Sequence, residues 1–286
     1  MTLIKINFAH FFMCLLPTIC SSVVFAGSMG GELTDPNLGE AYLGVFGGGG
    51  NMKTNTINQL GTAFTPRVTG GALGVNAYGV SPNASDWVVG GHIGYRWSSR
   101  PSNLFGKNWM FSPATELEGY YIGGATLKPT LNNPNDFLAF HTFNVSLPLR
   151  TGIVLMNGVL NMDQSLFTNF KPYIGFGAGI ASVNISGAFS EQIDPPEIGL
   201  NHYNSADSSS SVTLAFQPKV GLSYKLNEHS NVFVEYRFLY LTPTSVEFGN
   251  TNRTPAFPGH PITTNWTVAL SSQYYNMGTA GIQFDI

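Results

Sequence analysis

The chain has few charges and no cysteine beyond its first 26 residues. Only 10% of its 286 residues are charged, against about 25% in a soluble globular protein. The formal net charge is −3, from 13 basic and 16 acidic residues. This near-neutral balance provides no basic surface for phosphates, so a nucleic-acid partner is not expected.

The N-terminus has the pattern of a secretory signal peptide. Lys5 precedes the apolar segment Phe8–Phe25, and Val24–Ala26 places small residues where a signal peptidase cleaves. The sequence therefore predicts a signal peptide over residues 1–26 and export through the Sec pathway. An N-terminal membrane anchor and a lipoprotein modified at Cys20 are the alternatives.

Long apolar runs are absent after this segment, as are cysteines. Cys14 and Cys20 both lie in the predicted signal, so the mature chain would have no disulfide, zinc-thiolate site or cysteine nucleophile. Apolar stretches reach only about ten residues, whereas a spanning helix needs about 20. No transmembrane helix is expected in the mature chain.

What the sequence has instead is period-two alternation of apolar and polar residues. From Val212 to Leu226 every second residue is apolar, and after the polar turn Asn227–Ser230 the alternation resumes from Val232 to Tyr240. This pattern predicts a β-hairpin with an apolar outer face. Further alternating segments lie at residues 41–50, 87–97, 115–121, 143–153, 173–180 and 281–286.

Two of these segments need a decision about which face points outward. In 143–153 the apolar residues Phe143, Val145, Leu147 and Leu149 share one face with Ile153, and we expect that face to be outside, with Arg150 inside. In 41–50 either face could be the outer one.

The connections between segments alternate between long and short. The connections after the first, third, fifth and seventh segments are longer than those after the second, fourth and sixth. Long loops at one end and short turns at the other are typical of outer-membrane barrels. The sequence predicts an all-β, transmembrane antiparallel up-and-down β-barrel of eight strands over residues 40–286, with long extracellular loops, short periplasmic turns and a short periplasmic tail at 27–39.

Several segments resemble the opacity-protein-like, porin-family outer-membrane β-barrels. Lys171–Ala181 resembles their fifth strand, and Lys219–Leu226 followed by Phe233–Phe238 resembles their sixth and seventh. The layout over 41–286 is also similar to that of surface-antigen barrels of intracellular bacteria. The resemblance implies a Gram-negative outer-membrane protein that acts as a surface antigen, adhesin, envelope-stabilising barrel or small pore. One departure is the terminal Ile286, where such barrels commonly end in Phe or Trp.

Charged residues at inward positions predict a network inside the barrel. An eight-stranded barrel is just wide enough for side chains to fill it, and an unpaired buried charge is costly. We therefore expect the glutamates to pair with the bases and close the bore. A gated ion path is the alternative, and a small porin of ten or twelve strands is the rival. The predicted lumen network comprises Arg96, Glu116, Glu118, Arg150, Lys219, Glu235 and Arg237.

The sequence gives no reason to expect catalysis, a cofactor or a metal ion. The resemblance brings no shared catalytic residues, and the histidines are scattered. Asp194, His202 and Asp207 could form a protease-like group at the mouth of a loop, but such residues in an acidic loop are more often solvated. We therefore expect that the protein is not an enzyme.

The loops are the expected carriers of function. The third loop, residues 184–211, has a net charge of −4, from Glu191, Asp194, Glu197 and Asp207 without any Lys or Arg. Polar loops suit hydrogen bonding to a host or sugar ligand, and a merely hydrated, variable surface is an equal alternative. The expected partners are outer-membrane lipid and lipopolysaccharide, the barrel-assembly machinery and, through the loops, a host surface ligand.

Overall fold

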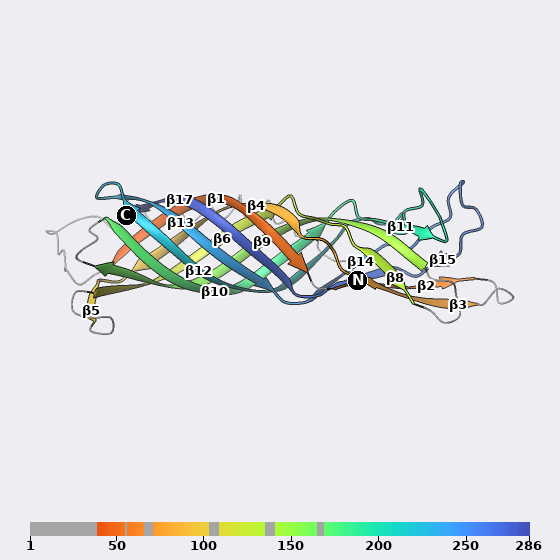
Figure 1. Ribbon diagram of the computed structural model, residues 1–286, viewed down its shortest axis with the longest axis horizontal. Coiled ribbons are helices and arrows are strands. Elements are labelled where there is room, and N and C mark those ends of the chain that lie inside the picture. The colour runs from red at the N-terminus through yellow and green to blue at the C-terminus, as the bar shows by residue number, and fades with distance from the viewer. Residues whose placement is uncertain (1–38, 55, 66–70, 103–108, 135–140, 165–168) are drawn as a thin grey trace, which may run out of the picture. The chain divides into compact units, whose positions relative to one another are not determined.

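The structure, a computed structural model, is built from antiparallel β-strands (Figure 1). No helix in the part of the chain that it describes is long and apolar enough to cross a membrane. The predicted signal peptide, 1–26, lies outside that part, and so does the predicted tail except for Gly39. The described residues are 39–54, 56–65, 71–102, 109–134, 141–164 and 169–286.

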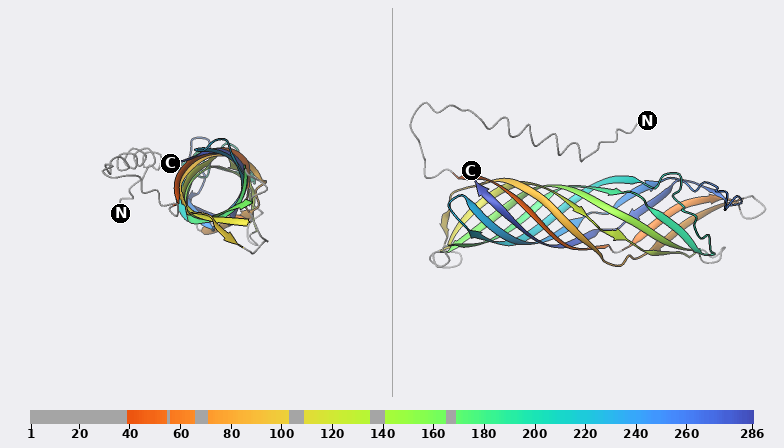
Figure 2. Two further views of the ribbon diagram at one scale, coloured as in Figure 1. Left: turned by 90° about the vertical axis from the view of Figure 1, so that its left-hand side faces the viewer. Right: turned by 90° about the horizontal axis from the view of Figure 1, so that it is seen from above.

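Eight long strands close into a barrel (Figure 2). Each is antiparallel to the strands beside it, and the first, β1, pairs with both the second and the last, so the ring has no open edge. The predicted all-β antiparallel up-and-down barrel of eight strands is confirmed. The barrel strands are β1 (Glu40–Thr54), β4 (Ala84–Arg96), β6 (Trp109–Gly123), β9 (His141–Gln164), β10 (Phe170–Ile185), β12 (Ser209–Lys225), β13 (Ser230–Leu241) and β17 (Gln273–Asp285).

The alternation in sequence becomes an alternation of exposure across the wall. In β12, Val220 is 51% exposed, whereas Lys219 beside it is 4% exposed. The predicted outer faces of 87–97, 115–121, 173–180 and 212–240 are confirmed in the same way. In β1, whose faces the sequence left open, Tyr42 and Phe46 point into the barrel and Val45 points outward.

The long loops carry strands of their own, which lengthen the wall at the end opposite the C-terminus (Figure 1). Around this extension the strands run in the order β11, β9, β8, β3, β2, β16, β14. The loop hairpins therefore do not widen the bore, as a barrel of ten or twelve strands would require. The remaining strands are β2 (Ile57–Phe64), β3 (Ala72–Gly79), β5 (Arg100–Ser102), β7 (Thr126–Leu127), β8 (Thr130–Asn133), β11 (Phe189–Asp194), β14 (Thr244–Phe248), β15 (Ile262–Thr263) and β16 (Trp266–Leu270).

The predicted facing of residues 143–153 is wrong. In β9 the apolar residues Phe143 and Leu149 are buried inside, and Arg150 is exposed on the outer face. The physical reason is length, because β9 has 24 residues, whereas crossing a membrane takes about 9–11. The first part of β9 belongs to the extension, where water is outside and apolar side chains turn inward.

The extension is closed over an apolar core. Its wall strands contribute side chains that are almost completely buried, and Trp266 is the largest of them. Burial on this scale fixes the register of the loop strands, because a slip by one residue would turn the apolar face to water. The core includes Ile57, Leu127, Leu131, Phe143, Val145, Leu147, Leu149, Val246, Phe248, Trp266, Val268 and Leu270.

Candidate functional site

Five charged side chains meet inside the barrel. Glu116 and Glu118 come from β6, Lys219 from β12, and Glu235 and Arg237 from β13. All five are buried, and the side chains of Arg237 and Glu118 are 0% exposed. We call these five residues the lumen cluster.

Two cations hold the three carboxylates of the lumen cluster together. The Lys219 Nζ lies 2.6 Å from Glu116 Oε2 and 3.1 Å from Glu118 Oε2. The Arg237 guanidinium donates to Glu118 Oε1 at 2.7 Å and also to Glu235. Because burying each charge is costly, loss of either cation would leave an uncompensated carboxylate inside the bore.

Neutral side chains complete the lumen cluster and close the space around it. Gln217 donates to Glu118 Oε1 at 2.9 Å, and the Tyr42 hydroxyl donates to Glu116 Oε1 at 2.9 Å. The Arg237 guanidinium also lies over the ring of Phe46, 3.7 Å from its centroid. Gly175 leaves the space that the Lys219 side chain fills, because a Cβ there would lie 3.1 Å from it.

The other two residues of the predicted network lie elsewhere. Arg96 is near the end of the barrel that carries the C-terminus, where it pairs with Asp285 on β17 at 2.6 Å. Arg150 lies on the outer face of β9 and was wrongly placed inside. Arg96 therefore does not meet the glutamates, because barrel closure supplies it with a nearer carboxylate from the last strand.

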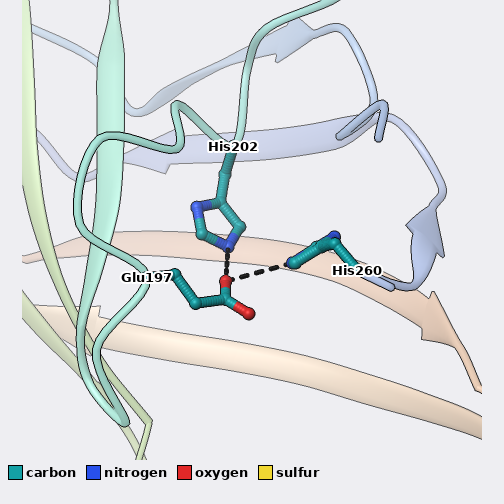
Figure 3. A group of neighbouring side chains, drawn as sticks. All are labelled: Glu197, His202 and His260. Atoms are coloured by element: carbon teal, nitrogen blue, oxygen red, sulfur yellow. Dashed lines mark hydrogen bonds and ion pairs between the residues drawn. The ribbon is translucent and has the colours of Figure 1, made fainter. Parts of the chain in front are cut away.

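A second cluster joins two loops at the far end of the molecule (Figure 3). Glu197 and His202 lie between β11 and β12, and His260 lies between β14 and β15. One oxygen, Glu197 Oε2, is 3.3 Å from His202 Nε2 and 3.0 Å from His260 Nε2. Figure 3 shows the carboxylate between the two imidazoles, and we call this group the Glu-His-His cluster.

The ring of His202 is fixed by its surroundings. It is 2% exposed and packs edge-on against Phe143 and Trp266. Its Nδ1 lies 3.0 Å from the backbone carbonyl oxygen of Ser190. A carbonyl only accepts, so Nδ1 carries the proton and Nε2 is the nitrogen left to face Glu197.

Glu197 is held as a carboxylate. Burial raises the pKa of its side chain, but hydrogen bonding to His202 and His260 more than offsets this and lowers the pKa to about 2. The side chain is still 24% exposed, so the Glu-His-His cluster opens to solvent on the Glu197 side.

The sequence pointed to His202 but not to its partners. Asp194 and Asp207, the carboxylates considered with it, are both exposed, and Glu197 occupies the place beside the ring. His260 is 58 residues from His202 in the chain, and no spacing pattern connects them. The contact arises only because the β14–β15 connection folds over the β11–β12 connection.

The outer surface of the barrel is apolar over a band that fits a membrane. The segment from Trp87 on β4 to Trp97, the residue after β4, spans eleven residues, the length of one membrane-crossing strand. Large apolar side chains on the outer face are half exposed, among them Val89, Phe176 and Val234. An exposed apolar surface marks a contact with lipid or with another protein, and a band of one membrane-crossing length around a closed barrel fits lipid.

Aromatic pairs lie toward both ends of this band. Trp87 and Tyr121 are at one end, with ring centroids 5.5 Å apart, and Tyr95 and Trp97 are at the other, with centroids 5.6 Å apart. Aromatic girdles at both interfaces are a property of outer-membrane barrels. The chain is an integral outer-membrane β-barrel.

Comparisons with known proteins agree with this fold and go no further. No protein-family model matches this outer-membrane barrel, and no curated protein matches it. Among solved structures it is similar to the outer-membrane protease OmpT from Escherichia coli, with 11% identity and a TM-score of 0.38, covering 86% of this chain and 97% of that one.

Two further solved structures are similar at the same level. The outer-membrane protein OprG from Pseudomonas aeruginosa is 12% identical with a TM-score of 0.34, covering 87% of this chain and 97% of that one. The translocator domain of the autotransporter NalP from Neisseria meningitidis is 12% identical with a TM-score of 0.26, covering 96% and 95%.

The expectation that the protein is not an enzyme is corrected by these comparisons. It rested on the absence of recognisable catalytic residues from a barrel of this kind. OmpT, a protein to which this barrel is similar, is a protease, so the architecture does not exclude catalysis. At 11% identity and a TM-score of 0.38 the likeness assigns no activity to this chain.

The lumen cluster predicts a large effect of removing one cation. Replacing Arg237 by Met keeps most of the side-chain volume but removes the guanidinium that Glu118 and Glu235 share. Lys219, 3.1 and 3.5 Å from the two carboxylates, would then face three negative charges with one positive charge. We expect Arg237→Met to lower the free energy of unfolding by about 3–5 kcal/mol, measured by urea unfolding of the refolded protein in detergent micelles.

The matched control is Arg150→Met, which removes the same charge from an exposed position on β9. It should leave the unfolding midpoint unchanged. Equal midpoints for Arg237→Met and the unaltered protein would show that the cluster does not stabilise the barrel.

Proposed function

We propose that this outer-membrane barrel does not conduct and that its role, structural or surface-interacting, is carried by the extension at the loop end. The observation that supports this most directly is the lumen cluster. Arg237 and Glu118 are fully buried in the bore and bonded to each other. A pore needs a continuous water-filled path, and these side chains stand across it.

A cavity inside the bore is too small to serve as a channel by itself. Below the lumen cluster, toward the end that carries the C-terminus, a cavity of about 20 Å³ lies between Tyr42, His92, Tyr173 and Phe233. This volume holds about one water molecule. The cavity supports the closed barrel over the small porin.

The extension offers a surface suited to contact. Its outer side chains on β9 are polar, with Asn144 exposed, and its strands are ordered by the apolar core behind them. A rigid polar face binds a partner without the entropic cost of ordering flexible loops. We infer that this face contacts a surface ligand, as an adhesin or surface antigen would.

Other proposed partners follow from the two parts of the molecule. The apolar band would lie in outer-membrane lipid and lipopolysaccharide, and the last strand, β17, would be read by the barrel-assembly machinery during insertion. The predicted signal peptide and Sec export are part of the same proposal, and so is the opacity-like, porin-family relationship.

Conductance measurement in a planar lipid bilayer tests the closed bore. We expect no channel steps from the refolded chain, whose folding is verified by its heat-dependent gel mobility. Reproducible steps that change in Glu235→Gln, a variant within the lumen cluster, would establish a pore and contradict the proposal.

Adherence of Gram-negative cells that display the protein tests the surface role. We expect these cells to bind an epithelial monolayer more than cells with an empty vector do. Val268→Asp buries a charge in the apolar core of the extension, where Val268 is 0% exposed, and should abolish the added adherence while the barrel stays inserted.

Ala269→Asp is the matched control, because it adds the same charge on the outer side of β16, opposite the uncharged Ser245 and Asn58. The loop end of this variant should resist limited proteolysis as the unaltered protein does. Adherence of the unaltered protein no higher than that of the empty vector would contradict the surface-interacting role.

A further inference from the structure

We propose that the Glu-His-His cluster binds one divalent transition-metal ion, with zinc as the ion that fits best. The ligands would be Nε2 of His202, Nε2 of His260 and a carboxylate oxygen of Glu197. This inference is independent of the proposed function. The metal site could be disproved while the non-conducting barrel and its surface role stand.

The orientation of the His202 ring leaves a place for a cation beside Glu197. Because Nδ1 donates to the Ser190 carbonyl, a neutral ring presents a lone pair at Nε2. In the neutral ring that lone pair faces Glu197 Oε2 at 3.3 Å, and the His202–Glu197 hydrogen bond forms when Nε2 also carries a proton. The contact becomes favourable only when a proton or a metal ion lies between them.

The carbonyl on the far side of the His202 ring is itself typical of a metal site. Histidine ligands usually donate their other N–H to a carbonyl or carboxylate, which fixes the ring and makes the metal-binding nitrogen more basic. Ser190 supplies this carbonyl from β11, where its side chain is fully buried. His202 is therefore held in the orientation that a ligand needs.

The spacing of the donor atoms suits a single ion. Ligand atoms about 2.1 Å from a tetrahedral ion lie roughly 3.4 Å apart, and the two nitrogen–oxygen distances here are 3.3 and 3.0 Å. All three donors lie within 4.8 Å of one another. A modest outward movement would place an ion between them.

The donor types select the metal. Two imidazole nitrogens and one carboxylate oxygen form a set that zinc uses in proteins, with a fourth position left for water or another ligand. Glu197 is partly exposed, with 24% of its side chain accessible, so that fourth position would face solvent at the loop end.

A similar grouping in the bore does not qualify. His92, Glu116 and Glu118 also bring three donor groups close together. There, however, the Lys219 ammonium already lies 2.6 Å from Glu116 and 3.1 Å from Glu118. A protein cation occupies the position that a metal ion would take.

Titration of the refolded chain in detergent micelles with Zn²⁺, after treatment with a chelator, tests the site. We expect one ion per chain by isothermal titration calorimetry, and strong visible absorption of the tetrahedral type when Co²⁺ replaces zinc. Glu197→Gln and His260→Ala should each weaken binding at least about tenfold and remove the cobalt spectrum.

Two controls separate this site from other histidines. His229→Ala changes an exposed histidine in the β12–β13 turn, and His92→Phe removes the histidine in the bore. Both variants should bind Zn²⁺ as the unaltered chain does. Glu197→Gln conserves the shape of the side chain. If His260→Ala fails to fold, Zn²⁺ binding by Glu197→Gln alone therefore tests the site.

Three results would overturn the site. They are no binding of Zn²⁺ by the folded chain, binding that survives both Glu197→Gln and His260→Ala, or binding that is lost only in His92→Phe. In the first case the cluster would only be a hydrogen-bonded contact that joins the two loops.

Discussion

The ion pair between Glu118 and Arg237 is the contact on which the closed barrel depends. The two side chains approach to 2.7 Å with no exposure to solvent, and they come from strands that do not pair with each other, β6 and β13. The pair therefore spans the bore, whose width is set by the number and stagger of the strands. Gln217 donates to Glu118 of this pair, and Tyr42 donates to the neighbouring Glu116 of the lumen cluster.

The surroundings of the barrel wall determine which of its faces is apolar. The apolar face is the outer one in the membrane and the inner one in the extension. Within the lipid band, apolar side chains such as Val220 point outward and the charges lie inside. In the extension the rule is reversed, so Phe143 and Trp266 point inward around a core. The strand β9 runs through both environments, with lipid outside one part and water outside the other. It thereby continues the barrel wall into the extension.

Much of the fold could be predicted from the sequence, because a lipid-facing strand records its environment in strict alternation. The β12–β13 hairpin and the inward placement of Glu116, Glu118, Lys219, Glu235 and Arg237 were accessible in this way. Arg150 was misplaced because the pattern of β9 is equally regular on either side of the membrane boundary. The Glu-His-His cluster was inaccessible, since its two histidines are brought together by loop packing and not by spacing along the chain.

A double-mutant cycle on the unfolding free energy tests most directly whether the Glu118–Arg237 pair closes the barrel. Glu118→Gln, Arg237→Met and the double variant would be unfolded in urea from the same detergent. The closed-barrel account predicts strong coupling, with a double variant far less destabilised than the two single losses together, because it leaves fewer unpaired charges in the bore. Additive losses would show that the two side chains do not depend on each other, and would contradict it.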